Sequence, residues 1–379
     1  MGRLILLLGF AILSFTSLVR AQKINAVKII PSIGDTFYRS VVRDQINESY
    51  LEQNKYRFWN FNNLSTPFTI AELYESPRKG KYFKYFPEAT LVLLKINGEE
   101  SYYHKKGGEL RCVGEVISCS FTKSGFIVGK YSPARLVIPG SFKIGDRYQN
   151  NVILSFALGK DEVIGKDNFM PFGSDSIMVK INFVQNATFN DYGWLLINGE
   201  RHEVMKITSG IYSLLSTQVK ASKNAKWKDI RISPTTLPDE LQRMISSSQW
   251  QETEFFTEKY RGPFFSYIKR NEDITEIIFQ NRNLTETEFI KYKDSSILLY
   301  PNPTYGDIYL DFLNMPRGDY RMEVYNIIGK KLIYKDFTLS TNSYQQLDLS
   351  TLKKGTYIYS ITDQNNRKII TRRLSIISL

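Results

Sequence analysis

Short stretches of alternating apolar and polar residues, separated by turn-forming residues, recur along almost the whole chain. Within Tyr320–Val324 every second residue is apolar, and the residues between them are charged. Such alternation places one face of a strand on a core and the other face in water. The dipeptides Asn97-Gly98 and Asn198-Gly199 are typical of tight hairpin turns. Together with 24 Tyr and 24 Phe, which fit half-buried pleated surfaces, the pattern predicts an all-β chain.

The pattern divides the chain into a long body and a short C-terminal region. The body, residues 22–291, is expected to be rich in β-sandwich structure, either as one unit or as two subdomains divided near 150–175. One short helix is expected near 236–247, because Leu237 and Leu241 recur at helical spacing around Pro238. Residues 297–379 hold seven short strand patterns, which predict a small seven-stranded Ig-like β-sandwich.

The N-terminus has the pattern of a secretory signal peptide, residues 1–21. Arg3 supplies an early positive charge, a mostly apolar stretch runs from Leu4 to Val19, and Ala21 offers a small residue for cleavage. The stretch is shorter than the ~20 apolar residues that a spanning helix needs. We therefore expect cleavage after Ala21. No later stretch is long and apolar enough to predict a transmembrane span in the mature chain.

The positive charge of the chain is spread along its length. The formal net charge is +12, and removal of Arg3 and Arg20 with the signal peptide would lower it to +10. A diffuse charge of this kind favours weak attraction to anionic polymers or lipid head groups. Nucleic-acid recognition needs a concentrated basic patch instead. Nucleic acid is therefore not an expected partner.

The chain has two cysteines, Cys112 and Cys119. Gly114-Glu115 between them is expected to turn a hairpin and bring the two sulfurs together. Because an exported chain enters an oxidising compartment, this arrangement predicts a Cys112–Cys119 disulfide. A structural zinc site would need four ligands. With only two histidines in the chain, the sequence predicts no metal site.

No recognisable catalytic motif is present. A serine nucleophile needs a histidine base, and neither His104 nor His202 lies in a catalytic motif. Asp35 and Asp146 each follow a glycine and are expected to stabilise turns. A pair of carboxylates can hydrolyse a glycosidic bond. Acids are densest at Glu99-Glu100, Asp161-Glu162 and Glu252/Glu254. None of these pairs has a recognisable context, so no catalytic or cofactor-binding residue is predicted.

The C-terminal region contains short motifs in a fixed order. They are Tyr300–Gly306, Tyr325–Gly329, Leu347–Ser350, Gly355–Ile361 and an apolar end at 374–377. This order resembles the type A C-terminal sorting domain of the type IX secretion system of Bacteroidota. The resemblance implies export by Sec and then by the type IX system, to the cell surface or the medium. It also implies two partners, the translocon and its sorting peptidase, and either release or attachment to surface lipopolysaccharide.

The same resemblance marks the residues of the expected sorting motif. The expected sorting residues are Tyr300, Pro301, Asn302, Pro303, Gly306, Gly329 and Gly355. Two segments are the leading candidates for recognition, namely Tyr300–Gly306 and the terminal strand Lys368–Leu379.

The body resembles uncharacterised all-β regions that precede the sorting domain in other type IX-secreted proteins. Its landmarks are Pro31–Asp35, Phe58–Phe61, Phe86–Ala89, Tyr131–Pro133 with Gly145-Asp146, and Asp191–Gly193. The resemblance implies no activity. We therefore expect a non-enzymatic surface module that binds a glycan or a protein. The alternative is a secreted glycosidase-like hydrolase that uses a carboxylate pair in the body.

Overall fold

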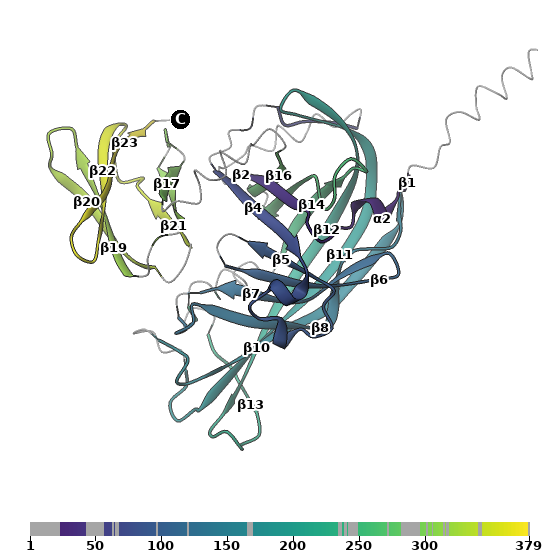
Figure 1. Cartoon of the computed structure of the whole chain (residues 1–379). Coiled ribbons are helices and arrows are strands. Elements are labelled where there is room, and N and C mark those ends of the chain that lie inside the picture. The colour runs from purple at the N-terminus through teal and green to yellow at the C-terminus, as the bar shows by residue number, and fades with distance from the viewer. Residues whose placement is uncertain are drawn as a thin grey trace, which may run out of the picture.

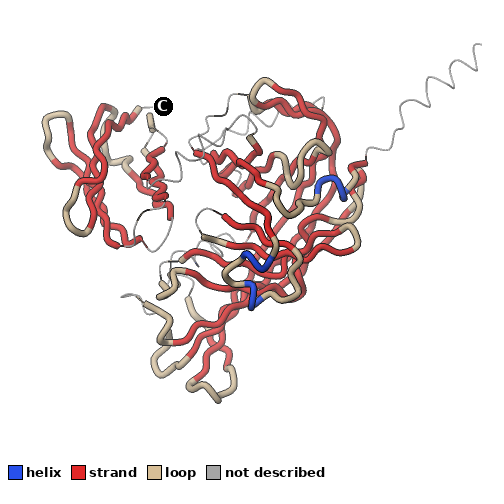
Figure 2. The backbone as a smooth tube through the Cα atoms, in the orientation of Figure 1, coloured by secondary structure: helices blue, strands red, loops and turns tan. Residues whose placement is uncertain are grey.

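A computed structural model describes most of the chain. The described residues are 23–42, 57–62, 64, 68–95, 98–119, 121–164, 170–233, 237–238, 241, 249–270, 273–281, 296–300, 302–304, 306–313, 315, 318–339 and 343–377. The expected signal peptide and most of the helix expected near 236–247 lie outside these residues. Among the described residues, no helix is both long and apolar enough to cross a membrane. The all-β class is confirmed, since strands dominate both parts of the chain (Figure 2).

The body contains one sheet of 14 strands, of which twelve form a closed circuit of antiparallel neighbours. The circuit closes because β12 pairs with both β14 and β11. In pairing order the twelve strands are β12 (Glu200–Lys220), β14 (Gln249–Phe256), β15 (Phe265–Arg270), β16 (Asp273–Gln280), β2 (Thr36–Val42), β4 (Phe68–Glu75), β5 (Leu91–Lys95), β6 (Glu100–Lys106), β7 (Glu109–Ser118), β8 (Phe126–Ile138), β10 (Arg147–Gly159) and β11 (Ser176–Ile197). The strands expected to form sandwiches thus belong to one sheet that closes on itself.

Smaller elements extend this circuit. Two short strands join its long hairpin, β13 (Lys228–Ile230) beside β12 and β3 (Phe58–Asn60) in parallel beside β11. A separate pair consists of β1 (Lys23–Ile24) and β9 (Phe142–Lys143). Within the described part of the body, the helical elements with defined bounds are α2 (Ala26–Ile29), η3 (Pro77–Lys79) and η4 (Phe83–Tyr85), and Leu241 is also helical. The three bounded elements are single turns or shorter, so the strands determine the fold.

The hairpin of β11 and β12 is the longest unit of the body, with strands of 22 and 21 residues (Figure 1, teal). Asn198 and Gly199 connect the two strands with φ angles of 51° and 77°. Positive φ at both central residues is the geometry of a type I′ turn, which favours Asn-Gly. The hairpin turn expected from the sequence at this dipeptide is confirmed.

Aromatic cores lie on both faces of the sheet. Phe256 packs against Phe142, with ring centroids 5.1 Å apart, in a cluster that includes Ile29 of α2. Its neighbour Phe255 points to the opposite face and packs against Trp59 of β3 at 5.0 Å. Consecutive strand residues face opposite sides. Two adjacent buried phenylalanines therefore mean that the sheet is covered on both sides here.

The C-terminal region forms a two-sheet sandwich. One sheet contains β17 (Ser296–Tyr300), β18 (Asp307–Leu313) and β21 (Ser343–Asp348), and the other contains β20 (Lys331–Leu339), β19 (Gly318–Asn326), β22 (Gly355–Asp363) and β23 (Lys368–Ile376). Its core draws buried residues from both sheets, among them Phe312 and Val324. The seven strands agree with the seven expected from the sequence, and the small sandwich is confirmed.

The cysteine region differs from its prediction. The segment from Cys112 to Ser118 belongs to one continuous strand, β7, and both cysteines are buried thiols that form no disulfide. Seven residues of strand at about 3.3 Å each separate the two Cα atoms by roughly 23 Å. A disulfide needs Cα atoms within about 7 Å. The predicted bridge between Cys112 and Cys119 is therefore wrong.

The reason lies at Gly114, which does not turn the chain. A Cβ atom at Gly114 would lie 2.1 Å from Cε1 of Phe86 and 2.5 Å from the carbonyl oxygen of Gly129. The strand pairing also shifts register between Cys112 and Gly114. Glycine at this position marks a β-bulge and lets Phe86 and the neighbouring strand approach the backbone closely. A glycine within a strand can have this role instead of forming a turn.

Candidate functional site

The closed circuit of the body encloses charged side chains. Glu252 and Glu254 lie two residues apart on β14 and so point to the same face. Glu254 interacts electrostatically with Arg39 of β2 and Arg135 of β8. Both strands lie several places away from β14 in the circuit. Side chains from such distant strands meet only inside the circuit, so this is a charged interior layer.

Burial changes the protonation of these carboxyl groups. Burial raises the pKa of Glu254, the neighbouring Glu252 adds to the rise, and the two arginines oppose it, so that the resulting pKa is about 8. Burial also raises the pKa of Glu252, against the effect of Arg135. At neutral pH Glu254 is therefore largely protonated and can donate a hydrogen bond. Carboxyl groups shifted in this way are frequent at functional sites and also occur in structural networks.

A chain of hydrogen bonds fixes the neutral part of the same interior. Asn150 binds both backbone groups of Leu136 at 2.9 Å and donates to Gln185 at 2.8 Å. Gln185 donates in turn to the hydroxyl of Ser209 at 3.0 Å. Tyr148, whose hydroxyl also bonds Ser209, interacts electrostatically with Glu254 and Glu252. The buried amides are satisfied, so this network holds the interior in one arrangement.

The other acid pairs predicted from the sequence have local structural roles. Glu99 binds Lys95 at 3.2 Å. Glu100 accepts the backbone N–H of Lys81 at 2.8 Å and the hydroxyl of Tyr102. Glu162 accepts a backbone N–H in its own turn at 2.8 Å. Of the acid pairs noted in the sequence, Glu252 and Glu254 are therefore the pair that approaches Arg39 and Arg135.

The two histidines do not meet at a site. His104 of β6 lies with Nδ1 2.7 Å from the carbonyl oxygen of Glu88. His202 of β12 is buried and packs on Phe264, with ring centroids 4.4 Å apart. In the part of the chain that the structure describes, no group of three or more His, Cys, Asp and Glu is arranged to hold a metal ion.

A cavity of about 430 Å³ opens at one end of the body. It lies between the start of β2, the loop that joins β14 to β15, and the end of β16. Its lining includes Tyr38, Lys259, Tyr260, Arg261 and Gln280. The volume falls in the range of small-molecule sites, and the lining brings aromatic, amide and charged groups together. The sequence did not indicate this cavity, because its walls are far apart along the chain.

The C-terminal sandwich gathers its motifs at one end. Thr304 forms a parallel bridge with Ile376 near the end of β23. Ile376 also pairs with Gly355, and Asn326 pairs with Tyr357 of the same strand, β22. The loop before β18, the β19–β20 turn, the start of β22 and the end of β23 therefore share this end of the molecule. We call it the motif end.

The loop before β18 is clamped onto the terminal strand by four hydrogen bonds. The side chain of Asn302 donates to the carbonyl oxygen of Arg373 at 2.8 Å and accepts the N–H of Ser375 at 2.9 Å. The N–H of Thr304 donates to the carbonyl oxygen of Ser375 at 2.9 Å, and Ile377 donates to Thr304 at 2.8 Å. The two segments that the export machinery is expected to recognise are therefore hydrogen-bonded to each other.

Two expected sorting glycines have clear local reasons. Gly306 has φ of +146°, and a Cβ atom there would lie 3.2 Å from Cα of Ser350. Gly329 has φ of +84° in the β19–β20 turn, where Asn326 accepts the N–H of Lys330 at 2.8 Å. Pro301, another expected sorting residue, lies outside the described residues. The described sorting residues all lie at the motif end.

Residues 298–376 match the family of secretion system C-terminal sorting domains. The match begins in β17 and ends with β23, so it spans the sandwich described above. The C-terminal region of this chain is a sorting domain of that family. A sorting domain of the type IX system supports export by that system to the surface or the medium.

The sorting domain is the part that the comparisons identify. No curated protein matches the chain. A search of solved structures finds PorZ of Porphyromonas gingivalis, an essential bacterial surface component of the type IX secretion system. The identity is 10%, the TM-score is 0.19, and the match covers 76% of this chain and 63% of PorZ. A TM-score this low carries no argument about the body.

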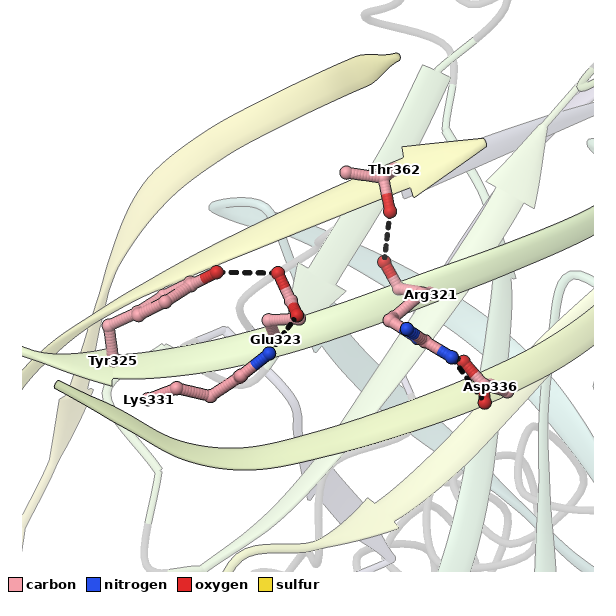
Figure 3. A network of polar contacts seen from close by, with 6 residues as sticks. All are labelled: Arg321, Glu323, Tyr325, Lys331, Asp336 and Thr362. Carbon is pink, nitrogen blue, oxygen red and sulfur yellow. Dashed lines mark hydrogen bonds and ion pairs between the residues drawn. The ribbon is translucent and has the colours of Figure 1, made fainter. Parts of the chain in front are cut away.

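The outer face of the sorting domain carries an ionic network (Figure 3). Arg321 forms a two-point pair with Asp336, with distances of 2.6 and 3.0 Å. Glu323 binds Lys331 at 2.7 Å and accepts the hydroxyl of Tyr325. The bonds to Lys331 and Tyr325 lower the pKa of Glu323, and the bond to Arg321 lowers that of Asp336. The network covers the sheet with paired charges beside the motif end.

The β19–β20 turn leaves two apolar side chains in solvent. Ile327 is 72% exposed and Ile328 is 83% exposed. The side chain of Asn326 holds the turn by accepting the N–H groups of Ile328 at 3.2 Å and Lys330 at 2.8 Å. Both side chains are therefore accessible to a partner on a turn whose backbone is fixed.

Proposed function

We propose that the chain is exported in two steps and acts at the cell surface or outside the cell. The signal peptide predicted at residues 1–21 would direct the chain across the inner membrane. The sorting domain would then direct it through the type IX translocon. The sorting peptidase would remove the domain, and the body would be released or attached to surface lipopolysaccharide.

We further propose that the translocon binds the motif end of the sorting domain. The supporting observation is the convergence there of Asn302, Gly306, Gly329, Gly355 and the end of β23. This end also carries two exposed isoleucines, at the β19–β20 turn. A rigid apolar turn beside a clamped terminal strand is a surface that a partner can bind without reordering the chain.

Export in the native host tests this proposal. Deletion of residues 297–379 should leave the chain in the periplasm. The point variant Asn302→Ala removes two of the four bonds of the clamp and should lower surface delivery several-fold. Asn365→Ala is the matched control, because Asn365 is exposed in the β22–β23 turn at the opposite end of the sheet. Normal delivery of the truncated chain would refute the route, and equal delivery of both point variants would refute the proposed surface.

For the body we propose a non-enzymatic function in binding an extracellular glycan or protein. The supporting observation is a cavity of about 430 Å³ at the end of the sheet circuit. A glycan array and a protein-binding screen on the purified chain test the proposal. Specific binding to a glycan or a protein is the expected result, and its absence in both screens would refute the proposal.

The alternative is a glycosidase-like hydrolase, and one observation favours it. Glu252 and Glu254 share the interior face of β14, and the pKa of Glu254 is raised to about 8. A carboxylic acid with a raised pKa can act as the general acid beside an ionised partner. A broad hydrolase screen with Glu254→Gln as the inactive variant tests this alternative. Turnover that the substitution abolishes would favour the hydrolase over the binding module.

A further inference from the structure

The cavity at the end of the body is lined by Arg261, whose guanidinium group uses only part of its hydrogen-bond donors within the protein. Arg261 donates from Nη1 to Asp35 at 3.0 Å, and its side chain is 42% exposed. Asp35 is itself held, because it accepts the N–H of Ser32 at 2.7 Å. The other guanidinium nitrogens of Arg261 have no partner among the described residues. A fixed guanidinium with free donors matches the two oxygens of a carboxylate.

The backbone around Arg261 is held from three sides. The side chain of Gln280 donates to the carbonyl oxygens of Arg261 at 2.6 Å and of Pro263 at 3.0 Å. Arg39 donates to the same oxygen of Pro263 at 3.1 Å. The N–H of Gly262, which has φ of +68°, donates to the carbonyl oxygen of Ile29 at 2.6 Å. A loop fixed in this way loses little conformational freedom when a ligand binds.

The remaining lining supplies charge, aromatic surface and amide groups. Lys259 is exposed on the same loop, so the charged lining consists of two cations and one acid, Asp35. Tyr38 and Tyr260 also belong to the lining, and the ring of Tyr260 is fixed by packing on Phe264 with centroids 4.5 Å apart. Gln280 uses its amide nitrogen for the loop, which leaves its amide oxygen to accept from a ligand hydroxyl. The net charge of the lining favours a ligand with one negative charge.

We propose that this cavity binds the carboxylate of a sugar acid, such as a uronic acid at the end of a glycan. The free donors of Arg261 bind the carboxylate, Lys259 adds attraction, and the tyrosines contact the sugar ring. Gln280 accepts from a ring hydroxyl. The inference rests on the proposed binding function of the body and states the ligand class and the site.

Calorimetric titration of the purified whole chain tests the proposal. The probes are a disaccharide that ends in glucuronic acid, its neutral counterpart that ends in glucose, and propionate, which has a carboxylate and no hydroxyls. The acidic disaccharide should bind at least about tenfold more tightly than either of the others. The neutral disaccharide lacks the carboxylate that pairs with Arg261, and propionate lacks the sugar ring and hydroxyls that the rest of the cavity contacts. Equal affinity for the acidic and neutral disaccharides, or for propionate, would overturn the proposal.

Substitutions locate the binding. Arg261→Lys keeps the charge and loses the two-point geometry, so it should lower the affinity for the acidic disaccharide by about tenfold. Lys259→Gln should lower this affinity by a smaller factor. Arg147→Lys is the matched control, because Arg147 is exposed on β10. Thermal unfolding of each variant confirms that it folds. Unchanged affinity in Arg261→Lys would overturn the site. Binding of a neutral glycan that no cavity variant alters would overturn this inference and leave the proposed binding function standing.

Discussion

At the scale of single residues, local chemistry was predictable and long-range contacts were not. Asp35 and Asp146 were expected to stabilise turns, and each accepts a backbone N–H three residues away, at 2.7 and 3.2 Å. The same Asp35 also binds Arg261, which lies 226 residues later in the chain. No spacing in the sequence indicates that contact. For the same reason Glu254 could be grouped with Glu252 but not placed inside the body.

Glu254 should make stability depend on pH. Its folded-state pKa is raised from 4.5 to about 8, so between these values the folded chain holds a proton that the unfolded chain has lost. Stability should therefore fall as the pH rises from about 4.5 to about 8, and level off above it. Denaturant unfolding across this range measures the slope. Glu254→Gln should flatten it, whereas Glu88→Gln, at an exposed position, should not. An equal slope in wild type and Glu254→Gln would contradict the prediction.

At the scale of elements, regular alternation of apolar and polar residues was enough to predict strands. A β-bulge at Gly114 was mistaken for a hairpin turn. The seven strands of the sorting domain follow from alternation and turns. In β7 the glycine at 114 has the same sequence appearance as a turn glycine, and only its neighbours distinguish the two meanings. The ring of Phe86 occupies the place where a side chain would lie and stacks on Tyr102, with centroids 4.5 Å apart.

Gly114→Ala should destabilise the body through this contact. The added methyl group would meet Phe86 and a backbone oxygen that cannot move independently, and overpacking of a core typically costs about 1–3 kcal/mol. Gly210→Ala is the matched control, because a Cβ atom at Gly210 of β12 has nothing within 4 Å. That change should be neutral or slightly stabilising. The free energy of unfolding from denaturant titration measures both, and equal values would show that Phe86 yields easily.

At the scale of the whole molecule, the landmarks of the body turn out to be contacts between distant strands. Phe58 pairs with Trp194, directly after the Asp191–Gly193 landmark, and a Cβ atom at Gly193 would lie 2.0 Å from the carbonyl oxygen of Arg57. The N–H of Gly145, in another landmark, donates to the carbonyl oxygen of Phe189 at 3.0 Å. The sequence showed the order of these landmarks. It could not show that the strands between them form one closed circuit, because the pairing of β2 with β16 joins residues more than 200 positions apart.

The closed circuit predicts how the chain responds to truncation. The described core of the sorting domain shares no residue with the cores of the body, so deletion of 297–379 should leave the unfolding midpoint of the body unchanged. Deletion of 23–42 removes β2 and opens the circuit between β16 and β4, and the body should then lose cooperative unfolding. Near-UV circular dichroism during thermal unfolding measures both. Loss of the transition in the first truncation would mean that the sorting domain stabilises the body, and its survival in the second would mean that the remaining strands form a stable open sheet.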